Sequence, residues 1–282
     1  MTLPTSNRAT IRALFVDIDG TLVASGERIS PGVLEALRAA RKKGCEIALC
    51  TGRTRYRIRY VVEQMPPPPG YAITSNGGVV THLGTGETIY RRLLPIPIAL
   101  EVVRTIVEAG SEPYVFEDSD RPGIEGARVL FHPDLPVGPW ADIPRYRPHV
   151  EILDELPFEP VSVSAFGPPQ IMRPLALHLQ ERLPQEVSII QSGSEHNWGI
   201  EIYVANISKR VGLETVAARL DIDREEILAI GDHMNDLEMI QWAGIGVAMG
   251  NALPEIRAVA DWVTASVTQD GVARAIEKYI LS

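Results

Sequence analysis

Asp17 and Asp19 follow the apolar segment "ALFV" and precede a glycine, in the motif "DIDGT". Side chains at positions i and i+2 of a strand point to the same side, so the two carboxylates would project together from the strand's end. Like charges this close are tolerated when a cation lies between them or when one carboxyl keeps its proton. The segment alone fits a simple Asp-Gly turn as well as it fits a chemical site. Other parts of the chain must decide between the two.

Three further polar motifs follow apolar segments or open helices. Thr51-Gly52 follows "CEIALC", Lys209 comes after Ser208 in "NISKR", and "GDHMND" at 231–236 follows "ILAI". Each has an ordinary explanation as a strand end or a helix cap. However, Lys209 is one of only four lysines, and a cation at a helix N-terminus opposes the helix dipole unless an anion accompanies it. One shared site explains the four motifs better than four coincidences.

Strands and helices alternate in the first and last thirds of the chain, which predicts an α/β fold with a doubly wound, Rossmann-like parallel sheet. In such a sheet, polar residues after different strands meet at the carboxyl edge. The strands are expected at "ALFVD", "CEIALC", "YAITSN", "IEIYVA", "ILAIGD", "IGVAMG" and "WVT", and helices at 31–43, 54–64, 209–220, 252–260 and 271–281, with a short one from 235.

The middle of the chain has a different pattern. After a hairpin in "THLGTGETIYRRLL", we expect a helix at 97–109, a proline- and glycine-rich region, the strands "VSVSAFG" and "VSIIQSG", and a helix at 170–183. This region is large enough to form its own core. The predicted organisation is a catalytic core of residues 1–94 and 195–282, with an inserted α+β cap domain of residues 95–194.

Composition narrows the classes of function. The net charge of −9 and pI near 5.2, without a basic cluster, argue against nucleic acid as the main partner. Apolar runs fall far short of the ~20 residues of a membrane span, and the first residues lack a signal-peptide pattern, so we expect a cytoplasmic protein. Cys45 and Cys50 are predicted on opposite faces of one strand, which precludes a disulfide between them.

The residue types at the four motifs suit phosphoryl transfer. Asp17, Asp19 and Asp232 offer the oxygen ligands that Mg²⁺ prefers. Thr51, the neighbouring backbone N–H groups and Lys209 would bind phosphate oxygens. One carboxylate could attack phosphorus and the other could transfer the proton.

The motifs "DIDGT", "TGR", "SK" and "GDHMND", in this order, resemble the four signatures of the haloacid dehalogenase superfamily of phosphatases. "ITSNGG", "VAMGNA" and "QDGVARAI" are similar to its Cof-type branch, in which a large cap is inserted between the second and third motifs. The resemblance implies that Asp17 is the nucleophile and a metal ligand, and that Asp19 is the general acid/base and binds the metal through its backbone carbonyl. It also implies that Asp232 is a metal ligand and that Asp236 supports the site from just outside. The residues implied to bind phosphate are Thr51, Gly52, Lys209 and Asn235.

The expected function is therefore a Mg²⁺-dependent phosphomonoesterase that acts through an aspartyl-phosphate on a small phosphorylated metabolite, such as a sugar phosphate or sugar-acid phosphate. Asp19 favours a phosphatase, because the dehalogenases of the superfamily lack this second acid. A phosphosugar mutase and a non-catalytic phosphate-binding module are the alternatives. The sequence does not identify the exact substrate or a role for His233. It also does not decide between a monomer and a homodimer. Four cap residues could either line a substrate pocket or belong to a solvated loop: Trp140, Arg145, Arg147 and His149.

Overall fold

The computed structural model describes residues 9–24, 28–65, 67–118, 129–130, 145–146, 156–193 and 196–282. The chain divides into two compact units. The first comprises Met1–Gly52, Ile58–Tyr90 and Ser208–Ser282, and the second comprises Arg53–Arg57 and Arg91–Ile207. Each unit is described by itself.

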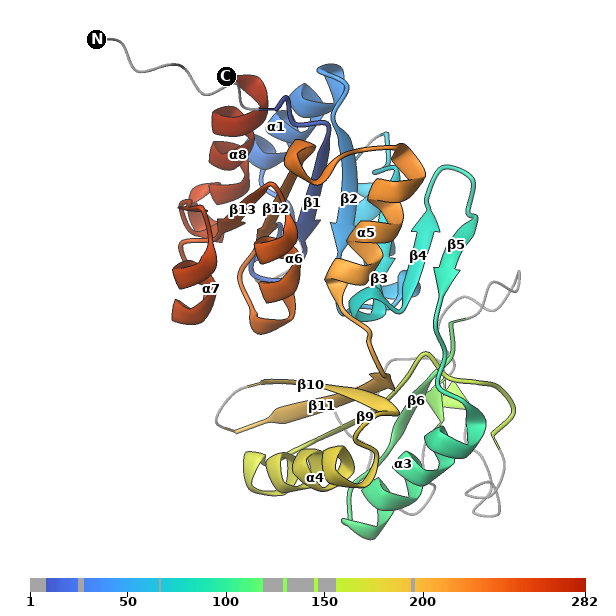
Figure 1. Cartoon of the computed structure of the whole chain (residues 1–282). Coiled ribbons are helices and arrows are strands. Elements are labelled where there is room, and N and C mark those ends of the chain that lie inside the picture. The colour runs from blue at the N-terminus through green and yellow to red at the C-terminus, as the bar shows by residue number, and fades with distance from the viewer. Residues whose placement is uncertain are drawn as a thin grey trace. The chain divides into compact units, whose positions relative to one another are not determined.

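An eight-stranded sheet forms the centre of the first unit, in the order β14-β13-β12-β1-β2-β3-β4-β5 (Figure 1). The six strands from β14 to β3 run parallel, and β4 is antiparallel to β3. β4 and β5 form the predicted hairpin, which lies at one edge of the sheet. This confirms the predicted parallel-sheet core. The bounds are β1 (Ala13–Asp17), β2 (Glu46–Cys50), β3 (Tyr71–Thr74), β4 (Val79–His82), β5 (Thr88–Arg91), β12 (Ile227–Gly231), β13 (Ile245–Ala248) and β14 (Trp262–Val263).

Helices pack against this sheet close to the predicted positions. In α1 (Pro31–Lys42), Ser30 caps the N-terminus by accepting a hydrogen bond from the Val33 N–H, and α1 packs against α8. The predicted helix 54–64 is divided into a 3₁₀ turn and a short α-helix. The turn η1 (Arg55–Ile58) lies mostly in the second unit, which contains Arg53–Arg57. The other bounds in the first unit are α2 (Arg59–Glu63), η2 (Ser75–Gly77), α5 (Lys209–Leu220), η4 (Arg224–Glu226), η5 (Met234–Asp236), α6 (Leu237–Trp242), α7 (Pro254–Val259), η6 (Val267–Gln269), α8 (Gly271–Ile276) and the π-helical turn η7 (Glu277–Leu281).

The second unit has a six-stranded sheet in the order β10-β11-β9-β6-β7-β8, and its helices α3 and α4 pack on it around a separate hydrophobic core. The predicted elements at 97–109, 161–167 and 170–183 are present with ends shifted by one residue, and the strand at 187–193 is present with the predicted ends. The bounds are α3 (Ile96–Glu108), β6 (Tyr114–Phe116), β7 (Val129–Leu130), β8 (Arg145–Tyr146), β9 (Ser162–Gly167), α4 (Pro169–Arg182), β10 (Val187–Gly193) and β11 (Trp198–Val204).

One strand assignment was wrong. The segment "IEIYVA" was predicted in the parallel core sheet, but it lies in β11, which pairs antiparallel with β10 and β9. The register joins Gly193 to Trp198, so β10 and β11 are consecutive arms of a hairpin. A connection this short permits only antiparallel pairing, because parallel strands need a long crossover. Of the four suggested cap-pocket residues, Trp140, Arg147 and His149 lie outside the described residues, as does the side chain of Arg145.

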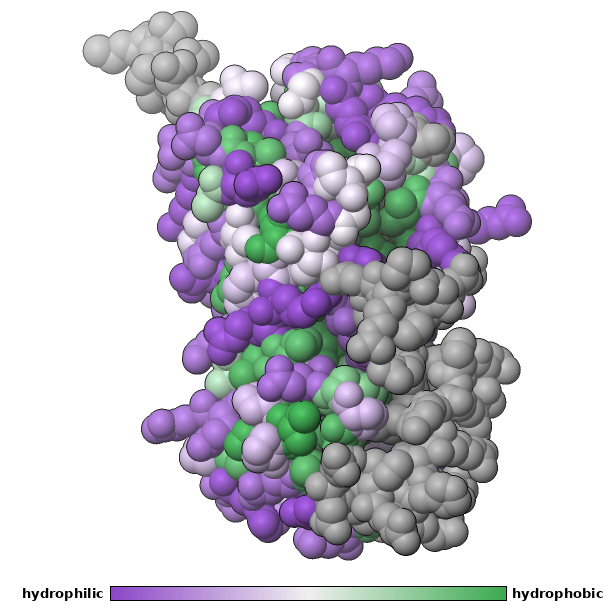
Figure 2. Space-filling model, turned by 90° about the vertical axis from the view of Figure 1, so that its right-hand side faces the viewer, coloured by the Kyte–Doolittle hydropathy of each residue, from purple (hydrophilic) through white to green (hydrophobic). Residues whose placement is uncertain are grey.

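The surface shown in Figure 2 is mostly hydrophilic, with small apolar areas between polar ones. Cys45 and Cys50 are buried free thiols in the first unit's core, as predicted. In the part of the chain that the structure describes, no helix combines the length and apolarity that a membrane crossing requires.

Candidate active site

The predicted site residues come together at the carboxyl edge of the core sheet. Asp17 is the last residue of β1, Thr51 directly follows β2, and Asp232 directly follows β12. Because β1 is hydrogen-bonded in parallel to both β2 and β12, these three positions lie on adjacent strand ends. Lys209, the first residue of α5, completes the group through its side chain.

Lys209 is the centre of a buried charge network. Its Nζ lies 2.6 Å from Asp17 Oδ1 and 2.5 Å from Asp236 Oδ1, and its side chain is 1% exposed. The protein itself thus supplies the anionic partners that the sequence argument required for this lysine. Burial alone would lower the pKa of Lys209, but the charges of Asp17 and Asp236 raise it above its ordinary value. The ammonium therefore stays charged.

Asp236 acts as a fixed bridge in this network. Its Oδ1 accepts from Lys209, and its Oδ2 accepts hydrogen bonds from the backbone N–H groups of Asp232 (2.9 Å) and His233 (3.0 Å). Both carboxylate oxygens are therefore occupied by protein donors. This arrangement orients the loop that carries Asp232.

The turn after β1 places Asp232 against the aspartate motif. Gly20 has φ +79°, and a Cβ at this position would collide with the Asp232 carboxylate. Thr21 Oγ1 donates to Asp232 Oδ1 at 3.3 Å. The Asp-Gly turn predicted from sequence exists, and it also creates the space for an acid from a distant strand. Asp19, on the same turn, is exposed, and its charge contributes to the raised pKa of Asp232.

A second group of contacts surrounds the predicted phosphate-binding residues. Thr51 is buried, and its backbone carbonyl accepts from the Asn76 N–H at 3.0 Å. Gly52 lies against the Asn76 side chain, where a Cβ would be within 3.0 Å of the amide nitrogen. Asn235 Nδ2 donates to Asn76 Oδ1 at 2.9 Å. Asn76 therefore connects the motifs that contain Thr51-Gly52 and Asn235.

Asp17 and Asp232 hold protons more tightly than isolated carboxyl groups. Burial raises the pKa of Asp17 well above its ordinary value, against the opposing effect of Lys209, and Asp236 raises it further. Burial, together with the charge of Asp236, raises the pKa of Asp232 to about 6. These shifts show that negative charge is concentrated in a partly dehydrated region.

The donor set fits a divalent cation. Asp17, Asp232 and Asp236 each have a carboxylate oxygen within 4.8 Å of the others, and among the described residues they form the acidic cluster that could hold an ion. With Lys209 as the neighbouring ammonium, three carboxylates leave an excess of two negative charges. Asp17 Oδ2 accepts no hydrogen bond among the described residues, and Asp232 accepts only long ones of 3.3 Å, so Asp17 and Asp232 are the side chains best placed to bind the ion. Hard oxygen donors of this kind suit Mg²⁺.

Three residues at the site were missed by sequence reasoning: Thr21, Asn76 and Asn251. Thr21 and Asn251 both donate to the Asp232 carboxylate, and Asn251 Nδ2 also donates to the Gly20 carbonyl at 2.8 Å. The signal was present, because Thr21 belongs to "DIDGT" and Asn251 to "VAMGNA". The contacts from Thr21 to Asp232 and from Asn251 to Gly20 span more than 200 residues of sequence, so the motifs alone did not reveal them. His233 contributes its backbone N–H, and the role of its side chain stays unassigned.

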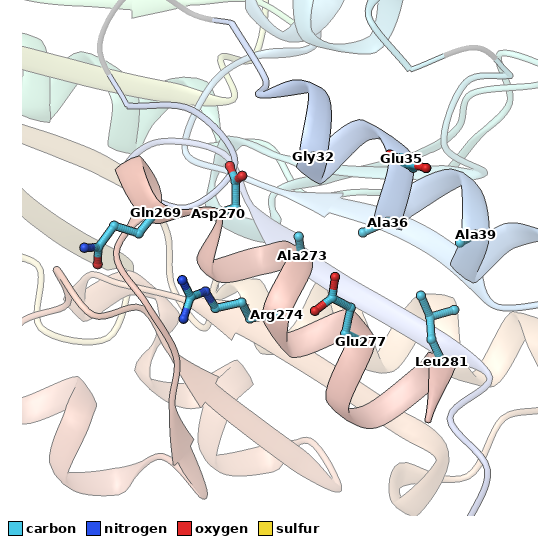
Figure 3. Close-up of a pocket in the computed structure, with 10 residues that line it drawn as sticks. All are labelled: Gly32, Glu35, Ala36, Ala39, Gln269, Asp270, Ala273, Arg274, Glu277 and Leu281. Atoms are coloured by element: carbon cyan, nitrogen blue, oxygen red, sulfur yellow. The ribbon is translucent and has the colours of Figure 1, made fainter.

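A groove of about 640 Å³ lies elsewhere on the first unit, between α1 and α8 (Figure 3). Its charged lining consists of Glu35, Asp270 and Glu277 with a single guanidinium, that of Arg274. This excess of carboxylates would repel a phosphate ester. The lining of this groove therefore does not suit a phosphorylated substrate.

A family model for haloacid dehalogenase-like hydrolases matches residues 14–276, which is nearly the whole chain. The chain belongs to this family. The recognition drawn from the four motifs is thereby confirmed, as is the expectation of an enzyme of this superfamily. The family generally uses a divalent metal, which agrees with the acidic cluster.

Relatives of this family member match over their full length. YxeH of Bacillus subtilis (strain 168), named as a candidate phosphatase, is 28% identical over 279 residues, covering 96% of this chain and 99% of its own. YitU of the same organism, named as a 5-amino-6-(5-phospho-D-ribitylamino)uracil phosphatase, is 26% identical, with 94% and 96% covered. Phosphatase names among such relatives agree with the predicted reaction class.

Solved structures give the same result for the fold. A haloacid dehalogenase-like hydrolase from Bacteroides thetaiotaomicron has a TM-score of 0.79 and 26% identity, covering 95% of this chain and 99% of that one. BT4131, described as a subclass IIB sugar phosphatase, has a TM-score of 0.78 and 25% identity, covering 95% and 98%.

Proposed function

We propose that the protein is a Mg²⁺-dependent phosphomonoesterase that hydrolyses a small phosphorylated metabolite through an aspartyl-phosphate on Asp17. The observation that carries the proposal is the buried Lys209 ammonium held between Asp17 and Asp236, beside Asp232. This arrangement combines a carboxylate nucleophile, a fixed cation for phosphate oxygens and an acidic metal site within one strand edge. Phosphoryl transfer needs these three elements together.

The first half of the reaction transfers the phosphoryl group to the protein. A carboxylate oxygen of Asp17 attacks phosphorus, and the bond between phosphorus and the ester oxygen breaks. Asp19, on the turn two residues later, donates its proton to the departing oxygen. Lys209 holds Asp17 Oδ1, and among the described residues none donates a hydrogen bond to Asp17 Oδ2. Asp17 thus keeps one oxygen for the attack while the ammonium fixes its orientation.

The second half releases inorganic phosphate. Asp19, now a carboxylate, takes a proton from a water molecule whose oxygen attacks phosphorus, and the bond from phosphorus to Asp17 breaks. Thr51, the Gly52 N–H and Asn235 would bind the phosphate oxygens during both steps. Asp17, Asp232 and the backbone carbonyl of Asp19 would hold Mg²⁺, which when bound neutralises charge on the phosphate oxygens.

The substrate class is proposed from chemistry and from the relatives together. BT4131 is described as a sugar phosphatase, and the substrate in YitU's name carries its phosphate on a ribityl chain. Both names support a sugar phosphate or sugar-acid phosphate as the substrate here. We further propose that the inserted domain, placed at residues 95–194 from sequence, selects the part of the substrate that leaves.

The test is hydrolysis of a generic aryl phosphate by the purified protein with Mg²⁺. Asp17→Asn should abolish phosphate release, while Asp221→Asn, at an exposed aspartate of the same unit, should leave it unchanged. Circular dichroism of both variants controls for folding. Full activity in Asp17→Asn would overturn the assignment of the nucleophile.

The alternatives are separated by the products. A phosphosugar mutase would interconvert hexose phosphates without net release of inorganic phosphate, and a binding module would retain phosphate without any turnover. A phosphate-release screen across sugar phosphates, sugar-acid phosphates, nucleotides and cofactor phosphates would then identify the substrate class.

A further inference from the structure

The turn η2 (Ser75–Gly77), which follows β3, has an unusual backbone for its residue types. Ser75 and Asn76 have φ values of +50° and +54°, and Gly77 follows with +99°. The left-handed region is unfavourable for residues other than glycine, although asparagine tolerates it better than most. Ser75 and Asn76 are also buried, at 2% and 1% exposure. A strained segment of this kind persists only where surrounding contacts hold it.

Those contacts lead to the proposed phosphate-binding residues. The Asn76 N–H donates to the Thr51 carbonyl at 3.0 Å, and the Asn76 side chain lies against Gly52. Its Oδ1 accepts from Asn235 Nδ2 at 2.9 Å. Gly77 lies against the Ser208 carbonyl so closely that a Cβ would collide with it, and the next residue after Ser208 is Lys209. The turn therefore touches three separate segments of the site.

A purely structural role for Asn76 would be to end β3 and begin β4. Glycine would satisfy that role at no conformational cost, as it does at the next position. The chain instead has a residue whose side-chain oxygen is aimed at Asn235. Because an amide oxygen can only accept, it selects the Asn235 orientation in which Nδ2 faces this turn, and the second N–H of that nitrogen stays available for an anion. Among the described residues, Asn235 makes no other side-chain hydrogen bond.

We infer that Asn76 is a positioning residue for the phosphoryl group: its side chain fixes the Asn235 amide and the Thr51-Gly52 segment relative to each other. This inference rests on the proposed function, because it assigns the anion to the same site. Its support is independent of the metal, however, since it comes from the strained backbone and from contacts that connect three motifs. The strain is then the consequence of aiming one buried amide at another segment of the site.

Asn76→Gly tests the inference. Glycine accepts the left-handed backbone and keeps the N–H to Thr51, so the variant removes the side chain alone. We expect about five- to tenfold weaker binding of inorganic phosphate in the presence of Mg²⁺, the effect of losing one hydrogen bond. Isothermal titration calorimetry measures this without turnover. Asp221→Gly is the matched control, because Asp221 is an exposed residue with φ +51° outside the site, and it should bind phosphate as the wild type does.

A double-mutant cycle distinguishes positioning from a general loss of structure. If Asn76 acts through Asn235, then Asn76→Gly should add less than about a twofold effect in an Asn235→Ala background. Two independent, multiplying effects would overturn the inference, as would unchanged phosphate affinity in Asn76→Gly alone. If Asn76→Gly loses its fold, Asn76→Ser gives the same comparison, because serine already adopts this conformation at position 75 and is too short to reach Asn235.

Failure of the inference and failure of the proposed function give different results. Wild-type protein that binds phosphate but hydrolyses no phosphoester would overturn the proposed function. The double-mutant cycle of phosphate binding could still be measured on such a protein. Wild-type protein that hydrolyses phosphoesters, with phosphate affinity unaffected by Asn76→Gly, would overturn the positioning role only.

Discussion

Replacing Lys209 by methionine removes the one ammonium at the centre of the buried network and keeps a side chain of similar length. Asp17 and Asp236 would then face each other with no cation between them. Loss of one partner from a buried ion pair costs about 3–5 kcal/mol, because the remaining charge is left uncompensated. For a unit of this size, each kcal/mol lowers the melting temperature by about 2–4 °C, so we expect a decrease of roughly 10 °C.

The sign of the pH dependence follows from the same charges. Without Lys209, the pKa of Asp17 should rise further above its ordinary value, so the folded state would bind this proton more tightly than the unfolded state does. Stability from a carboxyl group with a raised pKa is greatest at low pH and is lost as the pH rises through that pKa. The stability deficit of Lys209→Met should therefore shrink when the pH is lowered from neutral toward about 5.

The assay compares melting temperatures and aryl phosphate hydrolysis for Lys209→Met and Lys42→Met. Lys42→Met is the control, because it makes the same substitution at an exposed lysine at the C-terminal end of α1. Hydrolysis by Lys209→Met should fall by about 10²-fold or more, since a fixed electrostatic donor to the phosphate is lost. A melting temperature equal to that of Lys42→Met, or a deficit that grows on acidification, would refute the reasoning.

Two other changes test the metal side of the site. The pKa of Asp232 is raised from 3.8 to about 6, so protons compete with a cation for this carboxylate when the pH falls below about 6. Mg²⁺ should therefore raise the melting temperature more at pH about 7.5 than at pH about 5. Equal increases at the two pH values would contradict the assignment of Asp232 as a metal ligand. Gly20→Ala should lower both stability and Mg²⁺ affinity, because its Cβ would collide with Asp232 in addition to the positive φ. Gly44→Ala is the matched control, since Gly44 has φ +84° and an added Cβ would meet nothing within 4 Å. This variant should lose only about 1 kcal/mol of stability, measured by thermal unfolding. Its Mg²⁺ affinity should equal that of the wild type.

Local sequence patterns predicted the core well because its signals are local. The helix expected at 209–220 is α5 with the same ends, and Ser30 caps α1 as its position before Pro31 suggested. Parallel strand order then placed Asp17, Thr51 and Asp232 at one edge without any knowledge of their contacts. The residues of the candidate site were found for the same reason: each lies at or shortly after the end of a strand, or in the first turn of a helix.

Long-range pairing decided the features that sequence reasoning got wrong or missed. The apolar alternation of β11 fits either sheet, and only its short connection to β10 determines that it pairs in the second unit. Asn76 and Asn251 were visible in their motifs, but their partners Asn235 and Gly20 lie far along the chain. An anion was expected beside Lys209, but the sequence did not reveal that two protein carboxylates, those of Asp17 and Asp236, lie next to it.

The position of Lys209 explains why glycine is needed at α5. A lysine at the first position of a helix opposes the dipole, and it reaches Asp17 only if the helix lies very close to the sheet. At Gly212, one turn along α5, a Cβ would collide with the Ile73 side chain of β3, so this glycine permits the close approach. The unfavourable dipole interaction is offset by two carboxylates that the approach brings within 2.6 Å of Nζ. The buried cation therefore depends on backbone packing at β3 as much as on its own acidic partners.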